Sequence, residues 1–147
     1  MEPIRLEASR GRLRLELTCV PMGEDLLVAV SGGTRPHIGA VALAQARPSL
    51  RDPGARSATA SVLALLGHKE DGLARTLALT LSARTGAAVA VACGIHLDGA
   101  APGELRDAEA LAEQLAAELS GRLGGVDRAD PHGHHGKRAA VEGEDPC

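Results

Sequence analysis

Residues 67–95 read GHKEDGLARTLALTLSARTGAAVAVACGI, and their hydrophobic period changes part-way along. Leu73, Leu77 and Leu81 recur every four residues, which is the spacing of the apolar face of an amphipathic helix. Residues 87–95 then form a short, continuous apolar run that is typical of a buried strand. A helix followed directly by a strand indicates a domain that contains both kinds of element.

The residues before this helix predict strands. Residues 12–18 alternate strictly, so Leu13, Leu15 and Leu17 fall on one face of a half-buried strand. The turn-forming residues 21–25 make a hairpin with the next apolar run, which we expect to be covered on both faces, and a third strand would continue the meander. These further strands are expected at residues 4–8, 26–30, 37–44 and 57–65, with a surface loop at 47–56.

A second helix is expected after the strand at 87–95. It starts at about Gly103 or Asp107 and ends at Leu123, with an apolar stripe along one side. Beyond it the chain lacks apolar periodicity. The sequence therefore predicts one α+β domain over residues 1–123, a mostly antiparallel sheet of about five to six strands with two helices packed on one face, and a disordered histidine-containing tail over residues 124–147.

Composition excludes several classes of function. The 147 residues contain no Phe, Trp or Tyr, and the net charge is −3, so base stacking and a basic nucleic-acid surface are both unsupported. No apolar run approaches the roughly 18 residues of a membrane span, and no signal-peptide core is present. Three cysteines without CxxC spacing indicate reduced thiols. We expect a cytoplasmic protein that binds neither nucleic acid nor a membrane.

Three polar clusters interrupt the apolar pattern where the chain leaves regular structure. They are residues 31–37, 68–71 and 96–98, and each contributes a histidine. In the first, Gly32 and Gly33 permit positive φ angles and could expose backbone N–H groups to an anion. A hairpin loop that needs flexible residues explains the same glycines equally simply.

The other two clusters also allow a functional and a structural interpretation. His68 and Lys69 open a helix, where free backbone donors could meet a phosphate or carboxylate, although helix capping with solvated charges is the alternative. His96 and Asp98 lie two residues apart, so an extended chain would point both to one side and Asp98 could orient the imidazole. A hydrogen-bonded residue at a strand end is the alternative. The three histidines could converge within one subunit or across a dimer.

Taken together, residues 33–42 (GTRPHIGAVA), 67–71 (GHKED) and 94–98 (GIHLD) resemble the prenylated-flavin chaperone family, the small D subunits found with hydroxyarylic acid (gallate-type) decarboxylases. The resemblance covers about residues 26–119. It implies a fold similar to proteasome-assembly chaperones, often paired as a homodimer. It also implies a carrier of prenylated flavin mononucleotide (FMN), or of FMN, whose partner is a UbiD-type decarboxylase and whose supplier would be a flavin prenyltransferase.

The leading hypothesis is therefore a cofactor carrier that supports maturation of an aromatic acid decarboxylase, with no catalytic residue and no metal site of its own. The candidate cofactor-binding residues are Gly32, Gly33, Arg35, His37, Gly39, His68, Lys69, Glu70, Asp71, His96 and Asp98.

Two alternatives remain open. In a small metal-dependent enzyme, the three clustered histidines with Asp71 or Asp98 would hold a divalent metal and activate water. In a ligand-free assembly protein, the same histidines would be structural. The tail motif at residues 132–135 (HGHH) matches no structural zinc pattern.

Overall fold

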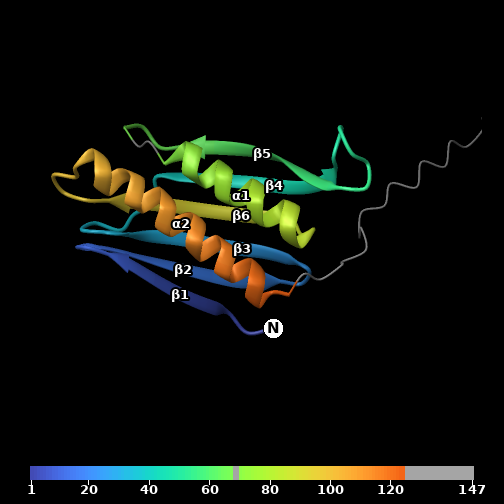
Figure 1. Ribbon diagram of the computed structural model, residues 1–147, viewed down its shortest axis with the longest axis horizontal. Helices are drawn as coiled ribbons and strands as arrows, with labels where there is room; N and C mark the ends of the chain where they lie inside the picture. Colours follow the sequence, from blue (N-terminus) through green and yellow to red (C-terminus); the bar gives the residue numbers. More distant parts are fainter. Residues whose placement is uncertain (68–69, 125–147) are drawn as a thin grey trace, which may run out of the picture.

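The computed structural model describes residues 1–67 and 70–124, and these residues form a mixed sheet with two helices (Figure 1). The α+β class, the six strands and both helices confirm the prediction, whereas the predicted tail from residue 125 onward lies outside the described residues. The elements are β1 (Ile4–Arg10), β2 (Leu13–Met22), β3 (Asp25–Gly33), β4 (Ala40–Pro48), β5 (Arg56–Ala64), α1 (Asp71–Thr85), β6 (Val89–His96) and α2 (Pro102–Arg122).

The strand order is β1-β2-β3-β6-β4-β5, so the predicted meander is wrong at its third step. The β2–β3 hairpin forms as predicted, but β4 does not pair with β3. Instead β6 lies between them, parallel to β3 and antiparallel to β4. Alternation along a strand shows which of its faces is buried but not which strand lies beside it. The order of the strands along the sequence therefore did not predict their order in the sheet.

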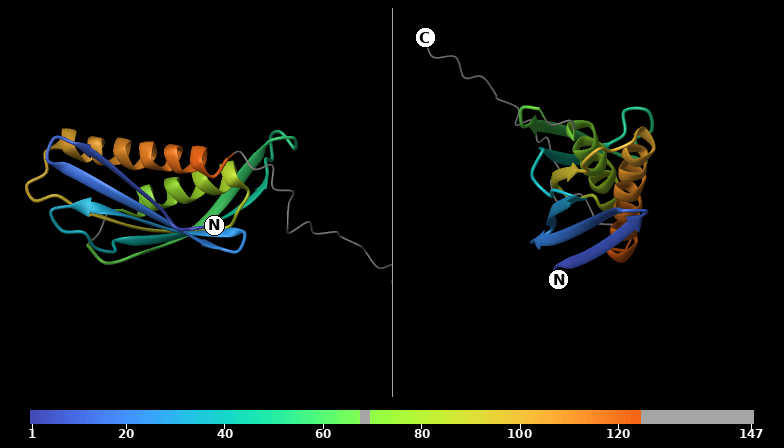
Figure 2. Two further views of the ribbon diagram at one scale, coloured as in Figure 1. Left: turned by 90° about the horizontal axis from the view of Figure 1, so that it is seen from below. Right: turned by 90° about the vertical axis from the view of Figure 1, so that its left-hand side faces the viewer.

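Both helices cover the same face of the sheet, as predicted (Figure 2). Helix α1 packs over β4, β5 and β6, and α2 packs over β1 and β2. Between the helices and the sheet lies a leucine, valine and alanine core in which Leu15, Leu77 and Leu115 are 0–1% exposed. Each such burial contributes about 1.5–3 kcal/mol relative to exposure, and aromatic residues are not needed to fill the space.

The opposite face of the sheet is open within the described chain. Leu26 and Val28 of β3 point toward the helices and are buried, whereas Leu27 between them is 42% exposed. The expectation that this strand is covered on both faces is therefore wrong. On β4 and β5, Leu43 and Leu63 are 58% and 82% exposed on the same open face.

The ends of two elements differ from the prediction. Strand β4 begins at Ala40 rather than His37 and continues to Pro48, so the surface loop is shorter than expected. The regular β4–β6 pairing ends at Ala40 and Cys93, although the Gly39 N–H still donates to the Cys93 carbonyl oxygen. Helix α1 begins at Asp71, later in the chain than the expected opening at residues 68–69, and Glu70 is its N-cap residue.

The remaining observations concern the thiols and the membrane. Cys19 and Cys93 are free thiols buried in strands, as expected. Among residues 1–67 and 70–124, neither helix has the length and apolar character that a membrane crossing requires.

Candidate functional site

The parallel pairing of β3 with β6 brings two of the polar clusters to one edge of the sheet. Gly33, the last residue of β3, pairs with His96, the last residue of β6. Carboxyl ends of parallel strands meet at the same edge, which is where open α/β sheets bind their ligands. Helix α1 begins at this edge as well. We call Arg35, His37, Glu70, His96 and Asp98 the histidine cluster.

His37 is fixed through both of its ring nitrogens. Its Nδ1 donates to the carbonyl oxygen of Arg35 at 3.0 Å. Its Nε2 lies 3.0 Å from Oε1 of Glu70, and the two side chains are only 22% and 13% exposed. The same carboxylate oxygen accepts a hydrogen bond from the backbone N–H of Ile95 at 3.4 Å. The N-cap residue of α1 therefore orients the imidazole against the end of β6.

His96 forms a second, more exposed group with Asp98 and Arg35. Its Nε2 lies 3.0 Å from Oδ1 of Asp98, and that oxygen accepts from the Arg35 guanidinium at 2.8 Å. Hydrogen bonds to His96 and then to Arg35 hold the pKa of Asp98 below its usual value of 3.8. Thr34 closes the group, because its hydroxyl donates to the His96 carbonyl oxygen and accepts from the Asp98 N–H.

The two imidazoles belong to one site. The ring centroids of His37 and His96 lie 6.5 Å apart in an edge-to-face arrangement. Two of the three predicted polar clusters, residues 31–37 and 96–98, therefore meet within one chain. His68 and Lys69 of the third cluster lie outside the described residues. Asp71 is an exposed residue in the first turn of α1.

The glycines of the predicted site let backbone segments approach one another. Gly33 has a φ of 79°, and a Cβ there would overlap the His96 carbonyl oxygen. A Cβ at Gly39 would overlap the Glu70 carboxylate, and one at Gly32 would overlap the Arg14 carbonyl oxygen. Gly33 and Gly39 thus allow close packing around the histidines, whereas Gly32 allows close packing against β2.

Backbone donors of the loop after β3 are used within the chain. The N–H groups of Thr34 and Arg35 both donate to the His96 carbonyl oxygen. They tie the loop to β6. Thr34 and Gly94 were not among the predicted site residues. The signals for them were a threonine directly after a glycine pair and a glycine two residues before His96. A Cβ at Gly94 would overlap the His37 carbonyl oxygen.

Exposed apolar side chains border the histidine cluster. Ile38 and Leu65 are each 57% exposed, and Leu66 is fully exposed. The Leu65 N–H donates to the Gly39 carbonyl oxygen, so this segment runs beside the histidine loop. Sequence reasoning treated residues 57–65 only as a strand and missed this apolar border.

The metal hypothesis depends on three converging ligands. In residues 1–67 and 70–124, no group of three or more His, Cys, Asp or Glu side chains has the proximity to hold a metal ion. The metal hypothesis also needs His68, which is not among these residues.

Comparison with known proteins identifies the family. A family model described as the prenylated flavin chaperone LpdD-like domain matches residues 9–124. The chain belongs to this family. The match contains the whole histidine cluster and reaches further toward the N-terminus than the three motifs, so β2 and the last two residues of β1 are also part of the LpdD-like domain.

A solved structure confirms the expected fold of this LpdD-like domain. It is titled a crystal structure of a novel chaperone complex for yeast 20S proteasome assembly, and it superposes with a TM-score of 0.53 at 17% sequence identity. The alignment covers 84% of this chain and 100% of that chain. At this identity the likeness shows the fold alone. No curated protein matches the chain.

Proposed function

We propose that this LpdD-like chain binds prenylated FMN at the histidine cluster, shields it, and passes it to a UbiD-type aromatic acid decarboxylase. The observation that carries the proposal is the convergence of Arg35, His37 and His96 at the edge where β3, β6 and α1 meet, inside the region that matches the prenylated flavin chaperone family. The chain acts as an accessory protein in the cytoplasm, and we assign it no catalytic residue.

The polar groups of the cluster suit the polar parts of a flavin nucleotide. The Arg35 side chain is 69% exposed and carries the charge that a phosphate group requires. Both printed bonds of the His96 ring use its Nε2, so its Nδ1 can meet a carbonyl or nitrogen atom at the pyrimidine edge of the flavin, while His37 stays bound to Glu70 and shapes the site. Glu70 and Asp98 carry opposing charge, but each is already engaged with an imidazole, which limits repulsion of the ligand.

The flavin ring system needs an apolar surface, and the chain provides it without aromatic residues. Ile38, Leu65 and Leu66 border the cluster with most of their surface exposed. Aliphatic contact without stacking gives less binding energy than an aromatic sandwich. Moderate affinity suits a carrier, because the ligand must leave again. The cofactor supplies the decarboxylation chemistry once it is bound in the partner enzyme.

We further propose that the functional unit is a homodimer formed through the open face of the sheet. Ala29 and Ala92 of the central strands have small side chains, so the centre of this face is low. The larger, exposed side chains of Leu27 on β3 and Leu43 on β4 lie on either side of it. A two-fold axis through this middle places the leucines of one copy over the alanines of the other, as in packed sheets about 10 Å apart.

Gel filtration tests the proposed function directly. The protein is mixed anaerobically with prenylated FMN or with ordinary FMN, and the flavin absorbance is followed through the column. Co-elution of prenylated FMN with the protein is expected, with weaker retention of FMN. If neither flavin co-elutes, the proposal fails and the ligand-free assembly protein becomes the better account.

A further inference from the structure

Strand β5 is an outer strand of the sheet, and one of its sides forms a free edge (Figure 1). On its other side it pairs with β4 in a continuous register from Arg56 to Ala64, without a bulge. Residues 57–64 read SATASVLA and contain neither a charged residue nor a proline. Charges, prolines and bulges are the features that usually keep an edge strand from recruiting further strands. Strand β5 has none of them over these residues.

The other outer strand, β1, is protected in the usual way. Its seven residues include Arg5, Glu7 and Arg10. Arg10 also forms an ion pair with Asp107 of α2, the helix that packs over β1. Charged side chains along an edge disfavour the addition of another strand. Of the two edges, β5 is therefore the one suited to strand pairing.

Alternate residues of β5 present their backbone groups to the free edge. The Leu65 N–H donates to the Gly39 carbonyl oxygen, so the odd-numbered residues of this strand face β4. The Ala60 carbonyl oxygen points the other way, because it accepts from Arg75 of α1 at 3.2 Å. The outward-facing positions are therefore Arg56, Ala58, Ala60, Val62 and Ala64.

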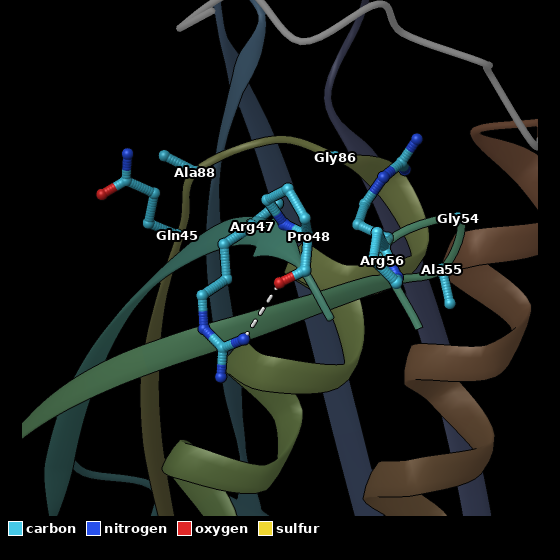
Figure 3. Close-up of a pocket in the computed structure, with 10 residues that line it drawn as sticks. Gln45, Arg47, Pro48, Gly54, Ala55, Arg56, Gly86 and Ala88 are labelled. Atoms are coloured by element: carbon cyan, nitrogen blue, oxygen red, sulfur yellow. Dashed lines mark hydrogen bonds between the residues drawn. The ribbon is translucent and has the colours of Figure 1, made fainter. Parts of the chain in front are cut away.

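Two exposed arginines lie beside this edge, on the side of the sheet that the helices cover. Arg75 reaches Ala60 from α1. Arg56 lies over Gly86 at the end of α1 and donates to the Arg84 carbonyl oxygen (Figure 3). Positions 56 and 60 are four residues apart, so about 13 Å of strand separates them. A strand added to this edge would meet positive charge at two places on one of its faces.

We infer that the free edge of β5 binds an extended, acidic segment of a partner protein as an additional antiparallel strand. Backbone hydrogen bonds to the outward-facing residues supply affinity, and alternate side chains of the segment supply specificity. Carboxylates four residues apart share one face of a strand, so they can lie opposite positions 56 and 60 and pair with Arg56 and Arg75. The incoming backbone replaces the bond from Arg75 to the Ala60 carbonyl oxygen, which releases that guanidinium for the segment.

A second copy of β5 fits this edge less well than an acidic segment does. A two-fold axis through the middle of the strand would bring the two copies of Arg75 together, and like charges placed side by side repel. The inference does not rest on the proposed flavin site. It is also separate from the proposed homodimer, which uses the open face of the sheet and leaves the edge of β5 free.

Titration of the full chain with short peptides, followed by amide NMR spectra, tests the inference. The probe is acetyl-TEVTVET-amide, a strand-forming peptide whose two glutamates are four residues apart. We expect saturable shifts and slower hydrogen exchange at the amides of Ala58, Ala60 and Val62. The same peptide with N-methyl groups on its second, fourth and sixth residues lacks the donors that face β5, so it should not bind.

Matched variants locate the binding at the edge. Ala58→Pro removes one outward N–H but keeps the bonds between β5 and β4, because proline is tolerated in an edge strand where its nitrogen faces solvent. It should weaken peptide binding by about tenfold, since a backbone bond is lost and the ring blocks the edge. Ala58→Ser is the control, because it keeps the N–H and should bind like the wild type.

A second peptide tests the acidic character of the partner. Acetyl-TQVTVQT-amide has the same backbone without the charges, and it should bind at least about threefold more weakly than the glutamate peptide, because two exposed ion pairs are lost. In an Arg56→Gln/Arg75→Gln double variant this difference should disappear. Arg5→Gln, an exposed arginine of the other edge strand, should preserve it.

The inference is overturned if the glutamate peptide gives no saturable shifts at millimolar concentration, or if N-methylation or Ala58→Pro leaves its binding unchanged. Equal binding of the glutamate and glutamine peptides to the wild type would overturn the acidic partner. Light scattering after gel filtration tests for a second copy at the edge. Ala58→Pro should keep the oligomeric mass of the wild type, whereas a lower mass would show that another copy of β5 occupies this edge and would overturn the inference.

Discussion

The imidazole rings of His37 and His96 meet edge to face with their centroids 6.5 Å apart. His37 comes from the loop after β3 and His96 from the end of β6, and a different carboxylate holds each ring. Glu70 at the start of α1 orients His37, and Asp98 orients His96. The arrangement depends on close approach of two backbone segments, so it should be sensitive to any side chain placed between them.

Gly94→Ala tests that close approach. The added methyl group would overlap the His37 carbonyl oxygen, which is backbone and cannot rotate away. Overpacking of this kind costs about 1–3 kcal/mol, so the free energy of unfolding in urea should fall by that amount. Gly72→Ala in α1 is the control, because a Cβ there meets nothing within 4 Å, and its stability should be unchanged or slightly higher. Equal stability of the two variants would contradict the packing described.

The fold class and the core faces could be predicted from sequence, because the alternation at residues 12–18 and the four-residue spacing of Leu73, Leu77 and Leu81 report burial directly. The insertion of β6 between β3 and β4 could not, since pairing partners are set by long-range packing. That insertion is what brings His96 to the loop that carries His37. The sequence motifs predicted that these histidines converge, but they did not show which strand pairing would bring them together.

Asp98 should titrate at an unusually low pH. Its hydrogen bonds to His96 and Arg35 favour the charged carboxylate and lower its pKa below 3.8. The group therefore contributes to stability at neutral pH, and this contribution is lost as the pH falls through the lowered pKa. Carboxyl-carbon NMR should give a midpoint below 3.8, and Arg35→Gln should move it upward. A midpoint at or above 3.8 in the wild type would contradict the hydrogen bonds.

The buried thiols should be unreactive in the native protein. Burial, with a smaller effect of the Glu70 charge, raises the pKa of Cys93 to about 12, and burial also raises the pKa of Cys19. At pH 8 only about one Cys93 thiol in ten thousand would be ionised. In a Cys147→Ser variant, Ellman's reagent should react with neither thiol before denaturation and with both afterwards. Rapid reaction of the folded variant would show that a strand thiol is accessible.

The proposed homodimer predicts a charge-sensitive interface on the open face. Light scattering after gel filtration should give about twice the 15.0 kDa chain mass for the wild type. Leu43→Glu should yield monomers, because a carboxylate would be buried against apolar residues. Leu50 is 89% exposed in the β4–β5 loop, so Leu50→Glu should stay dimeric. A monomeric wild type, or a dimeric Leu43→Glu variant, would refute this interface.

Anaerobic titration calorimetry with prenylated FMN tests most directly whether the histidine cluster is the cofactor site. The full chain is compared with the His37→Gln/His96→Gln double variant, in which the amides keep some hydrogen bonding and help the loop to stay folded. Arg75→Gln serves as the surface control, since Arg75 lies on α1 and donates to the Ala60 carbonyl oxygen. We predict measurable binding to the wild type and control and at least tenfold weaker binding to the double variant. Equal affinity in all three proteins, with the double variant folded, would contradict the account.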